Sequence, residues 1–171
     1  MTRSSRILQA VIDAEPLFSA PIVNHLQNPA ARANREHLLD AVDESVRAPG
    51  MHLPFLEFLA AIPEKLTTSH VVGEVNGLAK SRLKLYGPES RVFWNGSIDL
   101  LMRWNFDERL VALLDFAQDS ADEIVRAGVV DIGLIRLAQR SGAVLITGDE
   151  RTLAPLAREQ GVDCELLRNL L

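Results

Sequence analysis

The sequence predicts an α/β protein, in which a short parallel sheet forms the middle of three α/β/α layers. Short apolar runs alternate with segments of helical periodicity along the chain of 171 residues. The best-defined run, 143–147, follows Ser141-Gly142 and has the continuous apolar character of a buried parallel strand. The length fits one domain, so we expect residues 1–171 to share one core.

The first part of the chain predicts two strands separated by several helices. We expect a strand at 7–12, helices at 17–26, 30–47 and 54–62, and a short strand at 66–69. Pro16 suits the first turn of its helix, where its missing N–H has no partner to lose. The polar, amphipathic helix 30–47 is ended by Pro49-Gly50, and Pro63 closes the next helix.

The rest of the chain predicts five helices and two further strands. We expect helices at 71–85, 97–104, 120–126, 131–140 and 150–160, and strands at 143–147 and 162–166. Residues 86–96 contain Gly87-Pro88 and Asn95-Gly96, which predicts a loop. The run 110–116 fits a strand or a helix equally well.

Composition limits the classes of function. The chain is 47% hydrophobic and 24% charged, with a net charge of −5, which argues against a generic basic nucleic-acid binder. Only 5% of residues are aromatic, so base-stacking platforms are not expected. The one cysteine, Cys164, allows no intrachain disulfide and fits a reducing cytoplasm. No apolar stretch is long enough for a membrane span, so we expect a cytoplasmic protein without a membrane partner.

Two acids follow predicted strands. Asp13 comes directly after strand 7–12, and Asp149 follows strand 143–147 by two residues. In parallel α/β folds, ligands bind beyond the carboxyl ends of the strands, so both acids belong at one crevice. For either acid alone, a helix cap or turn residue is the commoner explanation.

Two further acids lie on predicted helices. Asp131 falls between Leu134, Ile135 and Ala138 on the inward face of its helix, where a bare charge needs a partner. Glu74 lies beside Leu78 at the edge of an apolar face, where an ordinary solvated glutamate is equally expected. Metal binding and helix capping both remain open for Asp131.

Three segments together resemble the PIN-domain nucleases. Segment 128–161, GVVDIGLIRLAQRSGAVLITGDERTLAPLAREQG, is similar to the second half of that family. Segment 71–83, VVGEVNGLAKSRL, looks like the family's central helix, and 10–17, AVIDAEPL, resembles its opening strand. The family often has Asn or Ser two places after its first acid, where this chain has Glu15. The stretch before Glu74 is also longer than in compact members, so the resemblance implies extra helices at about 30–62. The resemblance spans nearly the whole chain and implies a PIN-like fold.

The resemblance implies a metal-dependent endoribonuclease of the toxin type. Its catalytic and metal-binding residues would be Asp13, Glu74, Asp131 and Asp149, with Thr147 and Glu15 in support. Oxygen ligands of this kind suit Mg²⁺ or Mn²⁺, and RNA products would carry 5′-phosphate and 3′-hydroxyl ends. Candidate phosphate contacts, each taken alone more readily explained as a solvated helix residue, are Lys80, Arg82, Lys84, Arg136 and Arg151. The four histidines show no metal-ligand spacing.

The partners that the resemblance implies are an RNA substrate and, as in other small members, an antitoxin protein or a second copy of the chain. Two alternatives stay open. A non-catalytic PIN-like module that binds RNA or protein would fit the acidic charge and Glu15. An unrelated Rossmann-like protein, of a phosphohydrolase or response-regulator type, would use acids at strand ends but would leave Glu74 outside the crevice.

Overall fold

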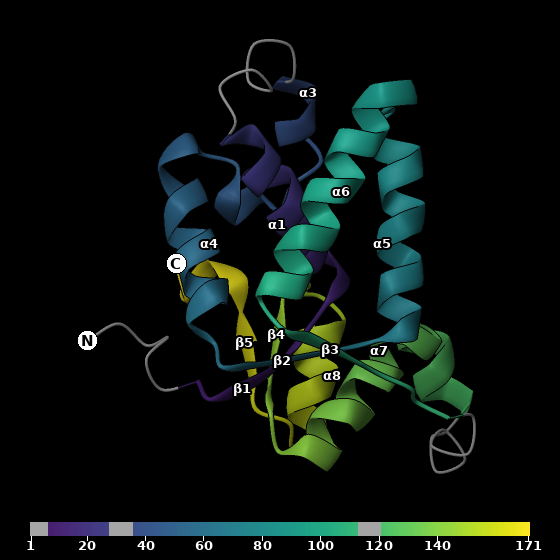
Figure 1. Ribbon diagram of the computed structural model, residues 1–171. Helices are drawn as coiled ribbons and strands as arrows, with labels where there is room; N and C mark the ends of the chain where they lie inside the picture. The colour runs from purple at the N-terminus through teal and green to yellow at the C-terminus, as the bar shows by residue number, and fades with distance from the viewer. Residues whose placement is uncertain (1–6, 28–35, 113–120) are drawn as a thin grey trace.

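Five parallel strands form one sheet in the order β3-β2-β1-β4-β5 (Figure 1). The computed structural model describes residues 7–27, 36–112 and 121–171. The strands are β1 (Gln9–Ile12), β2 (Glu64–Thr68), β3 (Phe106–Arg109), β4 (Val144–Thr147) and β5 (Cys164–Leu166). The predicted parallel α/β architecture is therefore confirmed.

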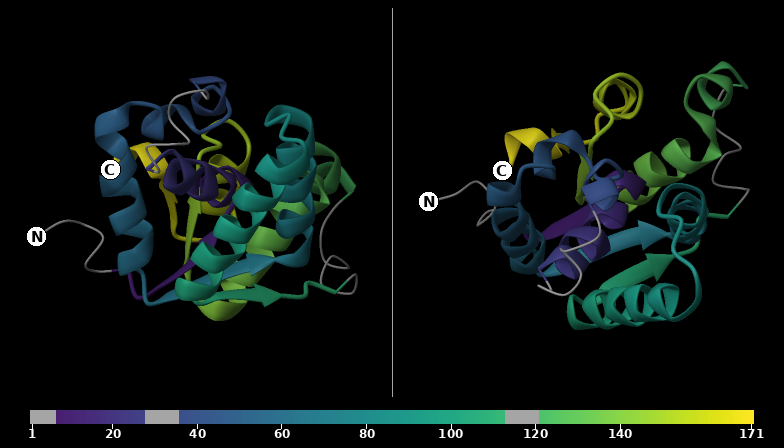
Figure 2. Two further views of the ribbon diagram at one scale, coloured as in Figure 1. Left: turned by 45° about the horizontal axis from the view of Figure 1, so that its top comes forward. Right: turned by 90° about the horizontal axis from the view of Figure 1, so that it is seen from above.

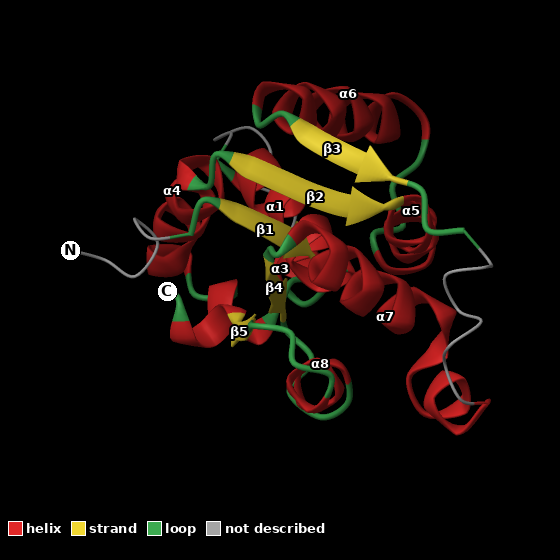
Figure 3. Cartoon of the chain, turned by 90° about the horizontal axis from the view of Figure 1, so that it is seen from below, coloured by secondary structure: helices red, strands yellow, loops and turns green. Residues whose placement is uncertain are grey.

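Helices cover both faces of this sheet (Figures 1 and 2). The α-helices are α1 (Ala14–Leu26), α3 (Glu36–Leu39), α4 (His52–Ala61), α5 (Ser69–Arg82), α6 (Gly87–Arg103), α7 (Ala121–Ser141) and α8 (Leu153–Glu159). Short 3-10 helices are η2 (Glu44–Val46), η3 (Pro49–Met51) and η5 (Leu167–Asn169). Figure 3 shows α7 and α8 on the face of the sheet opposite to α1, α4 and α6. No helix in the described part of the chain is both long and apolar enough to cross a membrane.

The core is aliphatic and centres on β1 and β4. Val11, Ile12, Leu145 and Ile146 are fully buried because helices pack on both faces of these two strands. Burial on both faces explains why the strands appear in the sequence as continuous apolar runs. The two strands pair in register, with Ile12 opposite Ile146, so the residues that follow them emerge at one edge of the sheet.

The predicted loop at 86–96 is wrong, because α6 already begins at Gly87. Pro88 lies in the first turn, which tolerates proline, and Asn95-Gly96 lies inside the helix. Phe93 is buried, and α6 packs along α1. This tertiary packing outweighs the turn propensity of Asn-Gly.

The single helix predicted at 30–47 is also wrong over its described part. The chain forms α3, then a turn, then η2, whereas residues 30–35 of that prediction lie outside the described residues. The Asp43 side chain caps η2 by accepting from the Ser45 N–H (2.8 Å), and the Asp43 N–H donates to Ser19 Oγ on α1 (3.0 Å). These local bonds end the helical run and hold the segment against α1. The additional helices expected within 30–62 are thus shorter than predicted, apart from α4.

The break expected between the helices at 120–126 and 131–140 is confirmed, because α7 is kinked at Gly128, whose backbone is not helical and has a φ of 84°. Only glycine adopts this conformation without steric cost. The ambiguous run 110–116 follows a strand instead: β3 ends at Arg109, and residues 113–120 lie outside the described residues. β3 is a polar edge strand, FDER, and therefore lacks an apolar pattern.

Candidate active site

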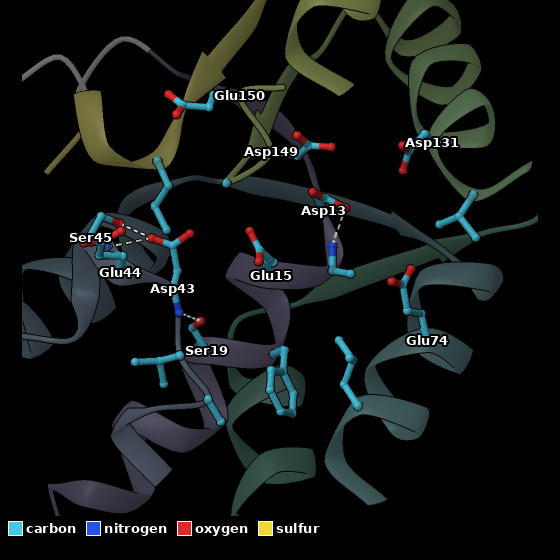
Figure 4. A pocket seen from close by; sticks show the side chains of 18 of the residues that line it. Asp13, Glu15, Ser19, Asp43, Glu44, Ser45, Glu74, Asp131, Asp149 and Glu150 are labelled. Atoms are coloured by element: carbon cyan, nitrogen blue, oxygen red, sulfur yellow. Dashed lines mark hydrogen bonds between the residues drawn. The ribbon is translucent and has the colours of Figure 1, made fainter. Parts of the chain in front are cut away.

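An open pocket lies at the carboxyl edge of the sheet, where β1 and β4 end (Figure 4). Its volume is about 1440 Å³. The four predicted catalytic carboxylates, Asp13, Glu74, Asp131 and Asp149, all line it. They come from the end of β1, from α5, from α7 and from the turn after β4, so only the fold brings them together.

Asp13 is held rigidly at the bottom of this pocket. Its N–H continues the sheet by donating to the Ile146 carbonyl (3.1 Å). Its Oδ1 accepts from the Ala14 N–H (2.6 Å), which caps α1, and its Oδ2 accepts from Thr147 Oγ1 (2.6 Å). Only 7% of the residue is exposed. Burial raises the pKa of Asp13 to about 6 against the opposing effect of these hydrogen bonds, and the charges of Glu74 and Asp149 add to the rise.

Thr147 links the two strand-end acids. It is fully buried, and while its hydroxyl donates to Asp13 it accepts from the Asp149 N–H (2.9 Å). Asp149 in turn uses Oδ1 to accept from the Arg151 and Thr152 N–H groups (2.8 and 2.9 Å). Asp13 and Asp149 are therefore cap and turn residues, as the commoner explanation expected, and they line the pocket as well.

Asp131 enters the pocket from α7. It lies three residues after the Gly128 kink, in the first turn of the second segment of that helix, and it is half-buried. Among the described residues its carboxylate has no hydrogen-bond donor. Burial raises the pKa of Asp131 to about 7, and the charges of Asp13, Asp149 and Glu74 contribute further. Its helical-wheel position on the inward side agrees with this placement.

Glu74 faces the pocket from α5 but stays exposed. Helix α5 starts directly after β2, with the Thr68 hydroxyl accepting from the Val71 N–H (3.3 Å). The negative charge of Glu74 raises the pKa of both Asp13 and Asp131, so its carboxylate acts on the same site. The Rossmann-like alternative expected Glu74 outside the crevice, and this placement counts against that alternative.

A second pair of carboxylates, Glu15 and Asp43, widens the acidic floor. A side chain at Gly148 would meet oxygens of both, so the two carboxylates converge on the same backbone atom. Figure 4 shows Glu15 and Asp43 as neighbours in the pocket. Partial burial of the carboxyl group raises the pKa of Glu15, and the charges of Asp43 and Asp13 raise it further. Asp43 was not among the predicted site residues. The only local feature that could have indicated Asp43 is its spacing of two residues from Ser45, which suits a capping aspartate. Such aspartates are common in turns.

Arginines surround the acids unevenly. Of the five predicted phosphate contacts, Arg82 and Arg151 line the pocket, whereas Lys80, Lys84 and Arg136 are not among its lining residues. Arg47 and Arg168 line it without having been predicted, and Arg168 forms an ion pair with Glu150. His70, which lacked any metal-ligand spacing, is also in the wall.

The carboxylate oxygens of the four acids are suitable ligands for a hard divalent cation, but they do not surround a common point closely. All four predicted ligands offer carboxylate oxygens, which Mg²⁺ and Mn²⁺ prefer. Within residues 7–27, 36–112 and 121–171, no three or more His, Cys, Asp or Glu side chains are arranged closely enough to hold an ion. An ion there would use one or two carboxylates directly and reach the others through water, as Mg²⁺ commonly does.

Comparison of the chain with protein-family models, with curated proteins and with solved structures gave no match in any of the three.

Proposed function

We propose that this chain is a metal-dependent endoribonuclease with a PIN-like domain, hydrolysing phosphodiester bonds of RNA. One observation carries the proposal: acids from four separate segments converge on one pocket, where burial and then the charges of the neighbouring acids raise the pKa values of Asp13 and Asp131. Perturbed carboxylates that gather in an open pocket are typical of catalytic sites. The sequence pattern that resembles PIN-domain nucleases selects these same four acids.

The chain's own residues would divide the work. Asp13, Asp131, Asp149 and Glu74 would hold the ion, directly or through water. When bound, Mg²⁺ or Mn²⁺ would lower the pKa of water and stabilise charge on the phosphate. Thr147 keeps the Asp13 carboxylate oriented. Asp131, whose carboxylate has no hydrogen-bond donor among the described residues, is the group best placed to accept a proton at Oδ.

The decisive experiment is an RNA cleavage assay that compares the parent chain with Asp13→Asn. We expect cleavage only with Mg²⁺ or Mn²⁺, products with 5′-phosphate and 3′-hydroxyl ends, and a loss of at least about 100-fold in Asp13→Asn, in line with the loss of a preorganised charged group. Asp163→Asn, an exposed acid that does not line the pocket, is the matched control. Metal-independent cleavage, or equal rates for the parent and Asp13→Asn, would refute the mechanism.

A non-catalytic module that binds RNA or protein is the second candidate. The open spacing of the carboxylates in the described chain and the net charge of −5 favour it. Metal titration separates the two. At an ion concentration about 100 times Kd, the proposed site would add about 2.7 kcal/mol to stability, and Asp131→Asn would abolish the shift in melting temperature. A parent protein that Mn²⁺ does not stabilise would support the module instead.

The toxin setting is a separate part of the proposal. It predicts that expression of the parent chain arrests growth while Asp13→Asn does not, and that a partner antitoxin relieves the arrest. Equal growth with both chains would contradict the toxin role but would leave the proposed nuclease activity standing.

A further inference from the structure

Positive charge lies on two sides of the pocket, while its floor carries carboxylates. Arg82 stands on the α5 side, and Arg47 follows η2 on the other side. Figure 4 shows Glu74 of α5 and Glu44 of η2 on opposite sides of Glu15. A polyanion that crosses this pocket would therefore meet a cation before and after the acids.

Arg82 is directed into the pocket by helix geometry. Glu74, Leu78 and Arg82 are spaced four residues apart, so they form one stripe along α5, and all three line the pocket. Arg82 lies about 12 Å along the helix from Glu74, at 1.5 Å per residue. Its charge lowers the pKa of Glu15, so the guanidinium acts on the acidic floor. Within the described residues its side chain forms no hydrogen bond or ion pair.

Arg47 is positioned by the segment that contains η2. Its N–H donates to the Glu44 carbonyl (3.3 Å), and η2 is fixed by the bonds of Asp43 to Ser45 and Ser19. The Arg47 side chain is exposed and has no hydrogen bond or ion pair in the described part of the chain. Arg168, on the same side, is instead engaged by Glu150.

We propose that Arg47 and Arg82, the flanking arginines, bind the phosphates on either side of the one that is cleaved. This inference rests on the proposed nuclease function and deepens it. A guanidinium without an ion-pair partner can bind a phosphate through two hydrogen bonds, in bidentate geometry. The acids between the two arginines repel phosphate, so the central phosphate would be bound by the metal ion. The pocket's 1440 Å³ exceeds the roughly 300–1,000 Å³ of a typical small-ligand site, so it has room for more than one nucleotide. The cleaved bond would then be internal to the substrate.

The salt dependence of RNA binding tests this directly. Fluorescence anisotropy of a labelled single-stranded RNA of about eight nucleotides would be measured without added divalent metal in the Asp131→Asn background, where cleavage should be slow. Each of Arg82→Ala and Arg47→Ala should make the slope of log K against log salt shallower by about 0.7. Lys80→Ala, an equal charge change on α5 outside the pocket lining, should not be distinguishable from the background. Slopes for the two arginine variants that match Lys80→Ala would overturn the inference.

Substrate length gives an independent readout. With metal, and with Asp131 intact, each arginine variant should cut the eight-nucleotide RNA with a kcat/KM roughly tenfold lower, mainly through KM. A dinucleotide has only the cleaved phosphodiester, so its kcat/KM should stay within about twofold of the parent value. Equal losses on both substrates would overturn the flanking role while leaving the nuclease proposal standing. A parent chain that neither binds nor cuts RNA would overturn the proposed function itself.

Discussion

Near the amino end of β2, Lys65 is 2% exposed, and its Nζ donates to the Ile62 carbonyl (2.5 Å). At the carboxyl end of β1, Asp13 is 7% exposed and faces other carboxylates. Burial shifts both groups toward neutrality, lowering the pKa of Lys65 and raising that of Asp13. For Asp13, but not for Lys65, neighbouring like charges increase the shift. A pKa shift caused by burial alone is therefore expected of any buried charged group. The added effect of neighbouring like charges distinguishes the candidate site.

The largest expected effect is on stability as a function of pH in metal-free buffer. Asp13 and Asp131 have pKa values raised from 3.8 to about 6 and about 7, so the folded chain binds protons more tightly than the unfolded chain. The free energy of unfolding should therefore fall as pH rises from about 4 to about 7, by on the order of 2–3 kcal/mol for the buried Asp13 alone. Urea melts in EDTA across this range measure it.

Asp131→Asn is the internal control for that profile, because it removes one of the two titrating groups. The variant should be more stable than the parent at pH 7 and nearly equal to it below pH 4. If the free energy of unfolding had the same pH dependence in the two proteins, the charge of Asp131 would not oppose folding. That result would contradict the proposed contrast between the two ends of the sheet.

A smaller effect is expected at the amino end. Lys65→Ala removes the donor to the Ile62 carbonyl and the packed aliphatic stem, so we expect a loss of about 1–3 kcal/mol of stability. Lys65→Met keeps most of the stem and should cost less. Because Lys65 does not line the pocket, RNA cleavage by the folded Lys65→Met variant should equal that of the parent. Slower cleavage by Lys65→Met would show that the amino end of the sheet also affects the candidate site.

Thr147 and Thr67 offer a matched pair of buried hydroxyls. Thr67 Oγ1 donates to the Ile12 carbonyl (3.1 Å), whereas Thr147 Oγ1 donates to the Asp13 carboxylate. Each change to Val should cost about 1 kcal/mol, measured by thermal unfolding. Thr147→Val should also slow RNA cleavage by roughly tenfold, since Asp13 loses its orienting bond. If Thr67→Val slows cleavage as much, the Thr147 bond has only a structural role.

The smallest effect is expected from Gly148→Ala. The new methyl group would meet the Glu15 and Asp43 carboxylates, which can move because they end flexible side chains. We expect a change of less than about 1 kcal/mol in stability together with a displaced Glu15 and Asp43. Gly50→Ala, with nothing near the added carbon, is the control. Unchanged Glu15 and Asp43 NMR chemical shifts in Gly148→Ala would contradict the convergence of the two acids.

Much of the fold could be predicted from local sequence. The buried strands β1 and β4 appear as apolar runs because helices cover both of their faces, and the acids after them follow from strand polarity. Asp131 was placed inward by periodicity alone, and α7 bears this out. β3 escaped prediction because an edge strand can be polar, and the start of α6 escaped because Gly87-Pro88 favours turns as well as first turns of helices.

What the sequence by itself determined was the alternation of strands and helices and the positions of four acids along them. Only the tertiary structure decided that these acids share a pocket, that Glu15 and Asp43 meet at Gly148, and that Arg47 and Arg82 flank them. Periodicity reports which face of an element is buried, because it depends on neighbours within a few residues. Charge convergence depends on contacts between segments far apart in the chain, such as Thr147 with Asp13, and no local pattern encodes them.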